Sequence, residues 1–145
     1  MKTITVKNAN TRKVAVKHFK NTLKEVSKET SRYYAYAFRD YIKEVLEQQL
    51  YKWKALSPSY AYYKKTNRLD SRILISTGDY VDSIKVFKYG EGYAVGLPHK
   101  KHAGSEVYLD HLAKIQEFGT RIIPPRPHWR TALSVFNRGV RAKVK

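Results

Sequence analysis

Neither glycine nor proline occurs before Pro58, so nothing in the first part of the chain interrupts a helix. Within it, residues 14–53 repeat mostly apolar side chains at steps of three and four, the spacing of one face of an α-helix. The repeat consists of Phe19, Leu23, Val26, Thr30, Tyr33, Ala37, Tyr41, Val45 and Gln49, widened by Phe38, Ile42, Leu46, Leu50 and Trp53. Charged side chains of the first half occupy the opposite face. We therefore predict one long amphipathic helix over residues 14–53.

A helix this long is large for a chain of 145 residues, a length that fits a single domain over residues 1–145. We hypothesise that part of it extends beyond its own domain toward a neighbour. A hydrophobic content of 42% is too high for a disordered chain. No apolar run approaches the length of a membrane span, and no secretory signal is visible at the N-terminus. We expect a soluble intracellular or assembly protein with no membrane partner.

The rest of the chain predicts a small body of strands and helices. Alternation over residues 2–7 predicts a short strand, and residues 83–97 predict a β-hairpin turning at Gly90. Because both faces of the hairpin carry apolar residues, we expect it to be covered on both sides. Shorter helices are expected over residues 108–118 and after Pro127, the second ending at Gly139 before a basic tail, residues 139–145. The predicted fold class is α+β: a long N-terminal amphipathic helix, a small antiparallel sheet and two shorter helices packed on it.

Charge separates this chain from an average protein. It carries 29 Lys and Arg against 12 Asp and Glu, a formal net charge of +17. Such a field favours polyanions or acidic protein surfaces as partners and opposes self-association at low salt.

Residues 59–72 form a polar connector that places Tyr60, Tyr62 and Tyr63 among basic residues. This pattern is typical of a stacking platform for single-stranded nucleic acid, or of a surface loop whose tyrosines pack on protein. We favour the packed loop.

Few residues suggest chemistry. The absence of cysteine excludes disulfides and thiolate sites. His99 and His102 are the best candidate metal ligands, but neighbouring lysines oppose a divalent cation, so we interpret them as loop histidines. Asp79 and Asp82 flank one short turn, and helix capping explains Asp79 without catalysis. We expect no enzyme, no metal and no cofactor.

Four motifs follow one another between residues 74 and 136. They are the segment from Leu74 to Ile84 around Thr77, Gly78, Asp79 and Ser83, the hairpin that ends in Val95 and Gly96, the run of Glu117, Phe118, Gly119 and Thr120, and the run of Pro125, Arg126 and Pro127. In order and spacing they resemble the neck and tail-completion proteins of tailed bacteriophages, the HK97 gp10-like and Mu virion-morphogenesis group. Tyr80 and Trp129 depart from this pattern, since the group usually has Leu, and Phe or Leu, at those positions. Both remain large and apolar.

The resemblance implies a structural virion protein that forms a closed ring, a hexamer, at the head–tail joint or tail top. It implies contacts with copies of itself and with adjoining connector, adaptor and tail proteins. The motif residues then have packing and turn roles, in the segment 73–138. Arg126 is the one motif residue with an evident polar role, bonding carbonyl groups or a carboxylate, for which Glu117 is the candidate.

The predicted loops carry basic residues that are free to meet a partner: Lys64, Lys65, Arg68, Lys100 and Lys101. We expect most of this charge to contact acidic surfaces of adjoining ring proteins, because lysines bound to phosphates would slow the passage of DNA. Non-specific contact with genomic DNA in the lumen stays open. The alternative function is a free-standing basic nucleic-acid-binding protein.

Overall fold

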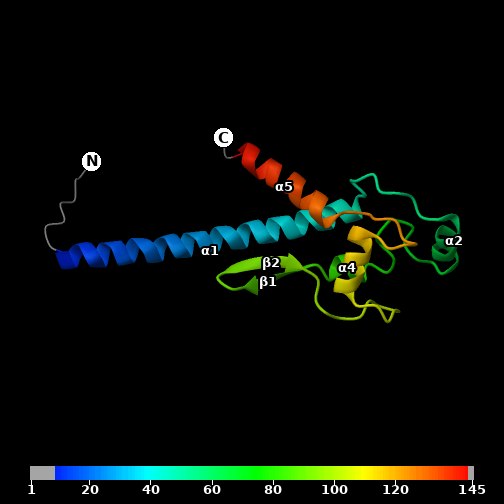
Figure 1. Cartoon of the computed structure of the whole chain (residues 1–145), viewed down its shortest axis with the longest axis horizontal. Coiled ribbons are helices and arrows are strands. Elements are labelled where there is room, and N and C mark those ends of the chain that lie inside the picture. The colour runs from blue at the N-terminus through cyan, green and yellow to red at the C-terminus, as the bar shows by residue number, and fades with distance from the viewer. Residues whose placement is uncertain (1–8, 144–145) are drawn as a thin grey trace.

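The computed structural model describes residues 9–143, with side chains from Val16 to Ala142, and confirms the predicted α+β class. Its largest element is helix α1 (Ala9–Glu47), whose 39 residues span about 58 Å at the usual rise. In Figure 1 the N-terminal part of α1 extends well past every other element, while its C-terminal part enters the body of the protein. The strand predicted over residues 2–7 lies outside the described residues.

Helix α1 begins earlier and ends earlier than predicted, and the end has a clear cause. Gln49 adopts a positive φ of 52°, and the N–H of Leu50 donates to the carbonyl of Val45 at 3.1 Å. This is a Schellman motif, which closes a helix with a left-handed residue that is most often glycine. The side-chain amide of Gln49 holds that conformation by bonding both the N–H and the carbonyl of Ile73. Residues 48–53, predicted as the last turns of the helix, therefore lie beyond its end.

The polar connector predicted over residues 59–72 was wrong in part, because it contains helix α2 (Pro58–Thr66). Ser57 caps this helix by accepting the N–H of Tyr60, and Pro58 supplies a preformed first turn. The helix has only nine residues and few apolar ones, so it shows no helical repeat of apolar residues in the sequence. Its consequence is that the tyrosines and lysines of this segment project from a helix and have fixed directions.

The sheet is a single hairpin formed by β1 (Lys85–Tyr89) and β2 (Gly92–Gly96). The strands pair antiparallel from Lys85 opposite Gly96 to Tyr89 opposite Gly92, as predicted. Helix α1 packs along the hairpin, most closely along β2. Our expectation that both faces are covered was wrong for the single chain, since Phe87 and Tyr89 are exposed.

Three further helices complete the body: α3 (Asp79–Asp82), α4 (Leu109–Phe118) and α5 (Trp129–Lys143). The first two match the predicted turn and helix. Helix α5 does not end at Gly139 as predicted but continues through it, so most of the expected basic tail is helical. Glycine inside a helix costs about 1 kcal/mol relative to alanine, which is not enough to end this one.

The core lies where the C-terminal part of α1 meets α3, α4 and α5. Its buried side chains are Ile42, Leu46, Ile75, Tyr80, Val81, Ile84, Leu109 and Ala132. Phe38 and Tyr41 extend it toward Phe136 of α5, with ring centroids 5.4 and 5.9 Å apart. Among the described side chains, none before Ala35 is buried, so the N-terminal half of α1 contributes little to the stability of the body. Among residues 9–143, no helix is both long enough and apolar enough to cross a membrane.

Candidate assembly surfaces and the motif corner

The N-terminal part of α1, residues 9–34, forms an arm that carries an exposed apolar stripe. The stripe consists of Val16, Phe19, Leu23, Val26 and Tyr33, each between 48% and 72% exposed. Their spacing of three and four residues is that of the core-facing side of a helix, yet the chain leaves them in solvent. Scattered exposed apolar residues are ordinary, but a continuous row along a projecting helix marks an interaction surface.

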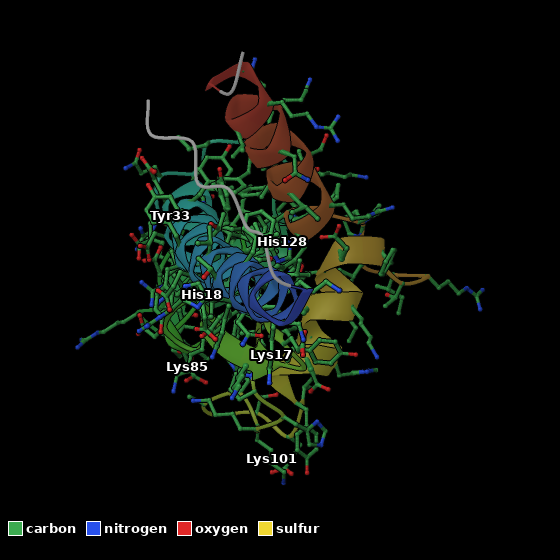
Figure 2. The ribbon with its side chains drawn as sticks, turned by 90° about the vertical axis from the view of Figure 1, so that its left-hand side faces the viewer. Lys17, His18, Tyr33, Lys85, Lys101 and His128 are labelled. Atoms are coloured by element: carbon green, nitrogen blue, oxygen red, sulfur yellow. The ribbon has the colours of Figure 1, made fainter. Side chains whose placement is uncertain are left out.

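The hairpin tip approaches the arm beside the stripe. Gly92 lies close to the Ser31 hydroxyl. A cavity of about 440 Å³ separates Lys28 from Lys88, and Leu23 of the stripe also lines it. Figure 2, which views the arm from its N-terminal end, shows Tyr33 on the upper left and Lys101 at the lower edge. The hypothesis that the long helix extends beyond its own domain is therefore supported by its geometry.

The body also carries large apolar side chains that are exposed. Phe118 at the end of α4 is 63% exposed, and Ile122 just after it is 90% exposed. Arg130 lies over the Phe118 ring with its guanidinium 4.8 Å from the centroid. The outer hairpin residues Phe87 and Tyr89 form another exposed apolar area. The chain thus has one apolar surface on its arm and different ones on its body.

Gly119 shapes the corner between α4 and α5, which comprises residues 117–129. Its φ is +74° with an extended ψ, and a Cβ there would lie 2.7 Å from the carbonyl oxygen of Ile123 and 2.8 Å from the nitrogen of Pro125. Only glycine combines this backbone with so close an approach. Thr120 completes the turn, since its hydroxyl accepts the N–H groups of Ile122 and Ile123. Gly119 is the C-cap of α4, but its extended ψ differs from the left-handed helical conformation expected at that position.

Glu117 caps the N-terminus of α5. Its carboxylate accepts the backbone N–H groups of His128, Trp129 and Arg130 and the Nε–H of Arg130, all at 2.9–3.1 Å. Burial raises the pKa of this carboxyl, but those hydrogen bonds outweigh it and the pKa lies below its ordinary value. Three orphan donors of the helix are thus satisfied by one residue eleven positions upstream.

Arg126 does not pair with Glu117, so the partner predicted for it was wrong. Its Nε donates to the carbonyl of Lys54 at 2.9 Å and its Nη2 to that of Ala55 at 3.2 Å. The indole of Trp53 makes a parallel bond to the carbonyl of Pro127, at 3.0 Å. The carbonyl role predicted for Arg126 is confirmed, and it ties the Pro-Arg-Pro run to the segment that follows α1.

Tyr80, His128 and Trp129 form a buried chain of hydrogen bonds. Burial lowers the pKa of His128, which is fully buried, so the ring is neutral. Its Nδ1 lies 3.0 Å from the carbonyl of Arg126, which can only accept, and so carries the proton. The Tyr80 hydroxyl then donates to His128 Nε2 at 2.7 Å and accepts the Trp129 indole N–H at 3.0 Å. Every polar atom of the three rings is satisfied.

Asp79 anchors the basic loop and does not cap α3, whose N-cap is Gly78, so the capping role predicted for Asp79 was wrong. Its Oδ1 lies 2.8 Å from the Lys100 ammonium, and its Oδ2 accepts the N–H of Ala103 at 3.0 Å. The hydrogen bond from Lys100 lowers the pKa of this carboxyl. Ser83 and Thr77 act locally: the Ser83 hydroxyl donates to Asp79, and Thr77 accepts its N–H. Gly78 takes the left-handed conformation that opens α3.

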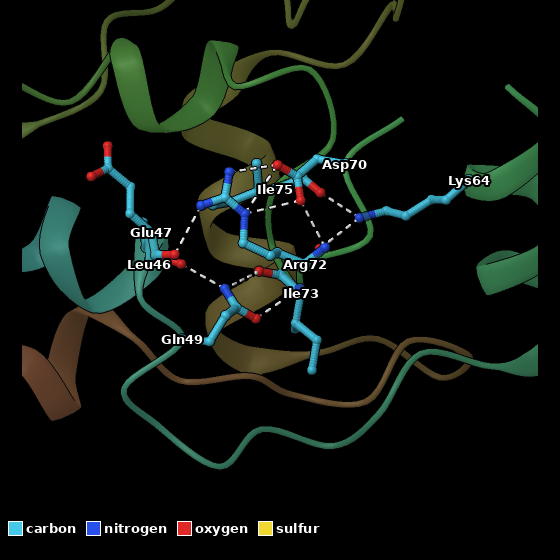
Figure 3. A network of polar contacts seen from close by, with 8 residues as sticks. All are labelled: Leu46, Glu47, Gln49, Lys64, Asp70, Arg72, Ile73 and Ile75. Carbon is cyan, nitrogen blue, oxygen red and sulfur yellow. Dashed lines mark hydrogen bonds and ion pairs between the residues drawn. The ribbon is translucent and has the colours of Figure 1, made fainter. Parts of the chain in front are cut away.

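The five basic residues expected to contact a partner differ in their exposure and in their ion pairs. Lys64 is 3% exposed and donates to the carbonyls of Arg72 and Ile75, so placing it on a free loop was wrong (Figure 3). Lys100 pairs with Asp79, and Lys101 pairs with Glu106. Lys65 and Arg68 are exposed and have no acidic partner among the described residues. Their positive charges are therefore not neutralised by a described acidic residue and can contact a partner.

Figure 3 also shows residues that sequence reasoning missed. Arg72 donates from two of its nitrogens to the carboxylate of Asp70. It also donates to the carbonyl of Glu47 at 2.8 Å, which joins the end of α1 to the segment before α3. The carboxyl of Asp70 has a pKa below its ordinary value because of the hydrogen bond from Arg72. Asp70 and Arg72, two positions apart, gave a local signal of an ion pair. Nothing in the sequence pointed to the distant carbonyl.

The two loop histidines do not share an environment. His99 lies 3.0 Å from an Asp110 carboxylate oxygen and stacks on the ring of Tyr108, with centroids 4.1 Å apart. His102 lines a cavity near α2. Among the described residues, no group of three or more histidines and carboxylates is placed to hold a metal ion.

In comparisons with known proteins, no protein-family model matches this chain, and neither a curated protein nor a solved structure matches it significantly. The functional argument therefore rests on the motifs and on the geometry described above.

Proposed function

We propose that this chain is a structural protein that assembles into a ring at the head–tail joint or tail top of a tailed bacteriophage. The observation that carries the proposal is the exposed apolar stripe on a projecting arm, attached to a body whose core does not include it. A chain that worked alone would gain nothing from five large apolar side chains held in solvent. The order of the four motifs over residues 74–136 indicates the kind of assembly, a phage neck or tail-completion ring.

The placement of the exposed surfaces favours a ring over a two-fold dimer. The stripe lies on the arm, whereas Phe118 and Ile122 lie on the body. An arm that contacts the body of the next copy makes a head-to-tail interface, and repeated contacts of that kind close into a ring when the rotation permits. The hexamer implied by the resemblance has this form of symmetry.

The motif residues support the proposal through what they position. Gly119, Glu117 and Arg126 together set the direction of α5 and tie the corner to the segment following α1. A ring needs subunits whose surfaces keep one relative direction, and a rigid corner provides this. The motifs thus act on shape, consistent with a structural protein.

The experiment is a mass measurement of the full chain, by light scattering and native mass spectrometry, at a salt concentration that screens the charge of +17. We expect a closed species about six times the 16.9 kDa of one chain. Phe19→Lys should abolish it while leaving the melting temperature of the body unchanged. Asn21→Lys adds the same charge about 200° around the helix and should leave the ring intact. A monomer that also stays absent from virions would sink the proposal.

A second function, non-specific nucleic-acid binding, is favoured by one observation on α2. Tyr62 is 70% exposed, and Lys65 and Arg68 nearby have no acidic partner among residues 9–143. Tyr60 and Tyr63, by contrast, stack on each other at 6.0 Å, which leaves less ring surface for bases. An affinity of the monomer for single-stranded DNA that falls steeply with salt, and is lost in Tyr62→Ser, would favour this function.

A further inference from the structure

A cavity of about 570 Å³ lies between α2, the segment after Leu74, the basic loop and α4. Its wall includes Lys64 from α2, Gln116 from α4, His102 from the loop and Arg126 from the corner. No aspartate or glutamate is among the residues that line it, all of which the structure describes. Apolar side chains such as Leu112 and Val107 form the rest of the wall. The cavity is therefore positive and amphipathic.

Its two strong cations are unusually buried. Lys64 is 3% exposed and Arg126 is 6% exposed, and burial lowers the pKa of both groups. The nearest acidic residue to Lys64, Asp70, is engaged by Arg72 through both carboxylate oxygens. Burying cations is costly, and two that repel each other are more so. The charge of Asp70 favours the protonated form of Lys64, but the hydrogen-bond acceptors of both cations are backbone carbonyls.

Donor capacity also remains. The ammonium of Lys64 has three N–H groups and uses two of them on the carbonyls of Arg72 and Ile75. The guanidinium of Arg126 has five and uses two, on Lys54 and Ala55. Both side chains can therefore donate hydrogen bonds to a bound anion without losing the bonds that hold them in place. Lys64 also lies 5.7 Å from the Tyr60 ring, which shields it on that side.

Gln116 provides an independent observation. Its Oε1 is buried and has no hydrogen-bond partner among the described residues. Buried polar side-chain atoms in native proteins nearly always have a partner, and an exception calls for an explanation. A missing ligand with an N–H group would satisfy this oxygen, since an acceptor pairs only with a donor.

We propose that this cavity binds an aspartate or glutamate side chain presented by a segment of a partner protein. The carboxylate meets Lys64 and Arg126, while a backbone N–H of the same segment reaches Gln116. This inference goes beyond assembly through the arm and does not depend on it. It assigns the protein a second, electrostatically selective contact.

A carboxylate fits better than the phosphate of a nucleic acid. Phosphates in a duplex lie on an outer ridge, and proteins contact them with exposed cations on open surfaces. Here the cations are buried side chains that line a cavity. The unpaired Gln116 oxygen also needs a donor, which a peptide backbone supplies next to its side chain and the phosphodiester group of a nucleic acid does not.

The test is a titration of the full chain, followed by amide NMR, with N-acetyl-glutamate N-methylamide as the probe. N-acetyl-glutamine N-methylamide is the neutral control of equal shape, and inorganic phosphate is the competing anion. We expect the glutamate probe to shift the amide signals of Gly104, Ser105 and Gln116 at concentrations where the glutamine probe does not. Lys64→Met should weaken binding about tenfold or more, as expected for a charge-assisted bond, and Lys65→Met should leave it unchanged.

If Lys64→Met fails to fold, the wild-type protein still decides the question. The Lys64 side-chain signals should then titrate at a higher pH when the glutamate probe is bound. Equal shifts from both peptide probes, shifts spread over exposed lysines, or no shift at all would overturn the proposal. Saturable binding of phosphate alone would overturn it in favour of a phosphate site.

Discussion

The indole N–H of Trp129 donates to the hydroxyl of Tyr80 at 3.0 Å, although 49 residues separate them in the chain. These are the two positions at which the chain departs from the motif pattern of the phage group it resembles. The structure shows that the departures contact each other, and that the Tyr80 hydroxyl donates its own hydrogen bond to His128. A tyrosine alone would bury a hydroxyl and a tryptophan alone would bury an N–H, so each residue satisfies the polar atom of the other.

The first prediction follows from this pair. Tyr80→Phe leaves the Trp129 N–H and His128 Nε2 unpaired in a buried site, and should lower the free energy of unfolding by about 1–3 kcal/mol. Trp129→Phe should cost less in the Tyr80→Phe background than in the wild type, because the indole N–H then has no acceptor to lose. Urea denaturation of the two single variants and the double variant measures the coupling, expected at about 0.5–3 kcal/mol. Additive effects would contradict it.

The second prediction concerns the cap of α5. Glu117→Gln keeps the shape of the side chain but replaces charge-assisted bonds with neutral ones, and should destabilise the protein by about 1.5–3 kcal/mol at pH 7. Glu106→Gln, whose partner Lys101 is exposed, should change stability by less than about 1 kcal/mol. Thermal denaturation of both variants compares them.

The same cap has a pH dependence with a definite sign. The pKa of Glu117 is lower in the folded protein than in the unfolded chain, so its stabilisation is complete above the unfolded value and is lost as pH falls through the folded value. The wild type and Glu117→Gln should therefore converge in stability in strong acid. A constant difference between them at every pH would show that the carboxylate charge contributes nothing.

A third prediction compares two glycines. Gly119→Ala places a Cβ against backbone atoms at a positive φ and should cost at least about 3 kcal/mol. Gly139→Ala lies inside α5 with nothing within 4 Å of the new Cβ, and should stabilise the protein by about 0.5–1 kcal/mol. Melting temperatures moving in opposite directions would confirm both roles. A tolerated Gly119→Ala would mean that the corner can relax.

The fourth prediction rests on His128. Its pKa is lowered by burial, so the unfolded chain binds a proton below about pH 6.5 that the folded protein does not. Stability should fall as pH drops below that point, by up to about 1.4 kcal/mol per pH unit from this group. Urea midpoints from pH 7.5 to 5.5 measure the loss. Side-chain NMR of His128 gives the control: protonation of its ring in the fully folded protein would contradict the buried neutral state.

The fifth prediction tests where the basic loop points and depends on the proposed function. Neutralising Lys100 and Lys101 should reduce the joining of heads to tails more than it changes the release of DNA. Because Lys100 also holds Asp79, the matched comparison is Lys101→Gln alone, whose partner Glu106 is a surface residue. Counting joined and separate particles by electron microscopy measures the effect. Normal joining with faster DNA release would place these lysines in the lumen.

Regular patterns in the sequence were enough to predict the fold class. Alternation and glycine placement located the hairpin, and steps of three and four located α1 and α4, because these elements have one apolar side. The predicted C-terminal ends of α1 and α5 were wrong for two different reasons. Gln49 ends a helix in a conformation usually given by glycine, because its side chain bonds the distant Ile73. Gly139 lies inside α5 because the cost of one glycine is too small to end the helix.

The polar contacts were harder to predict. Carbonyl groups or a carboxylate were expected to accept from Arg126, with Glu117 as the candidate carboxylate. Arg126 instead donates to carbonyls, and Glu117 accepts backbone N–H groups at the start of α5. Lys64 was expected in solvent because lysine usually is, and it is buried because two free carbonyls lie beside it. Which carbonyls remain unpaired depends on the tertiary fold, so it cannot be predicted from the pattern of side chains in the sequence.

One continuous helix joins the arm to the core, and this makes the arm a lever. Ile42 and Leu46 hold one end among buried side chains, while residues 9–34 extend about 39 Å beyond with no bend at glycine or proline. A tilt of about 10° at the core would move the tip by roughly 7 Å. Small repacking of the body is thus amplified into a large displacement of the apolar stripe on the arm. In the proposed ring, a few side chains near Ile42 would therefore set the diameter of what the arms enclose.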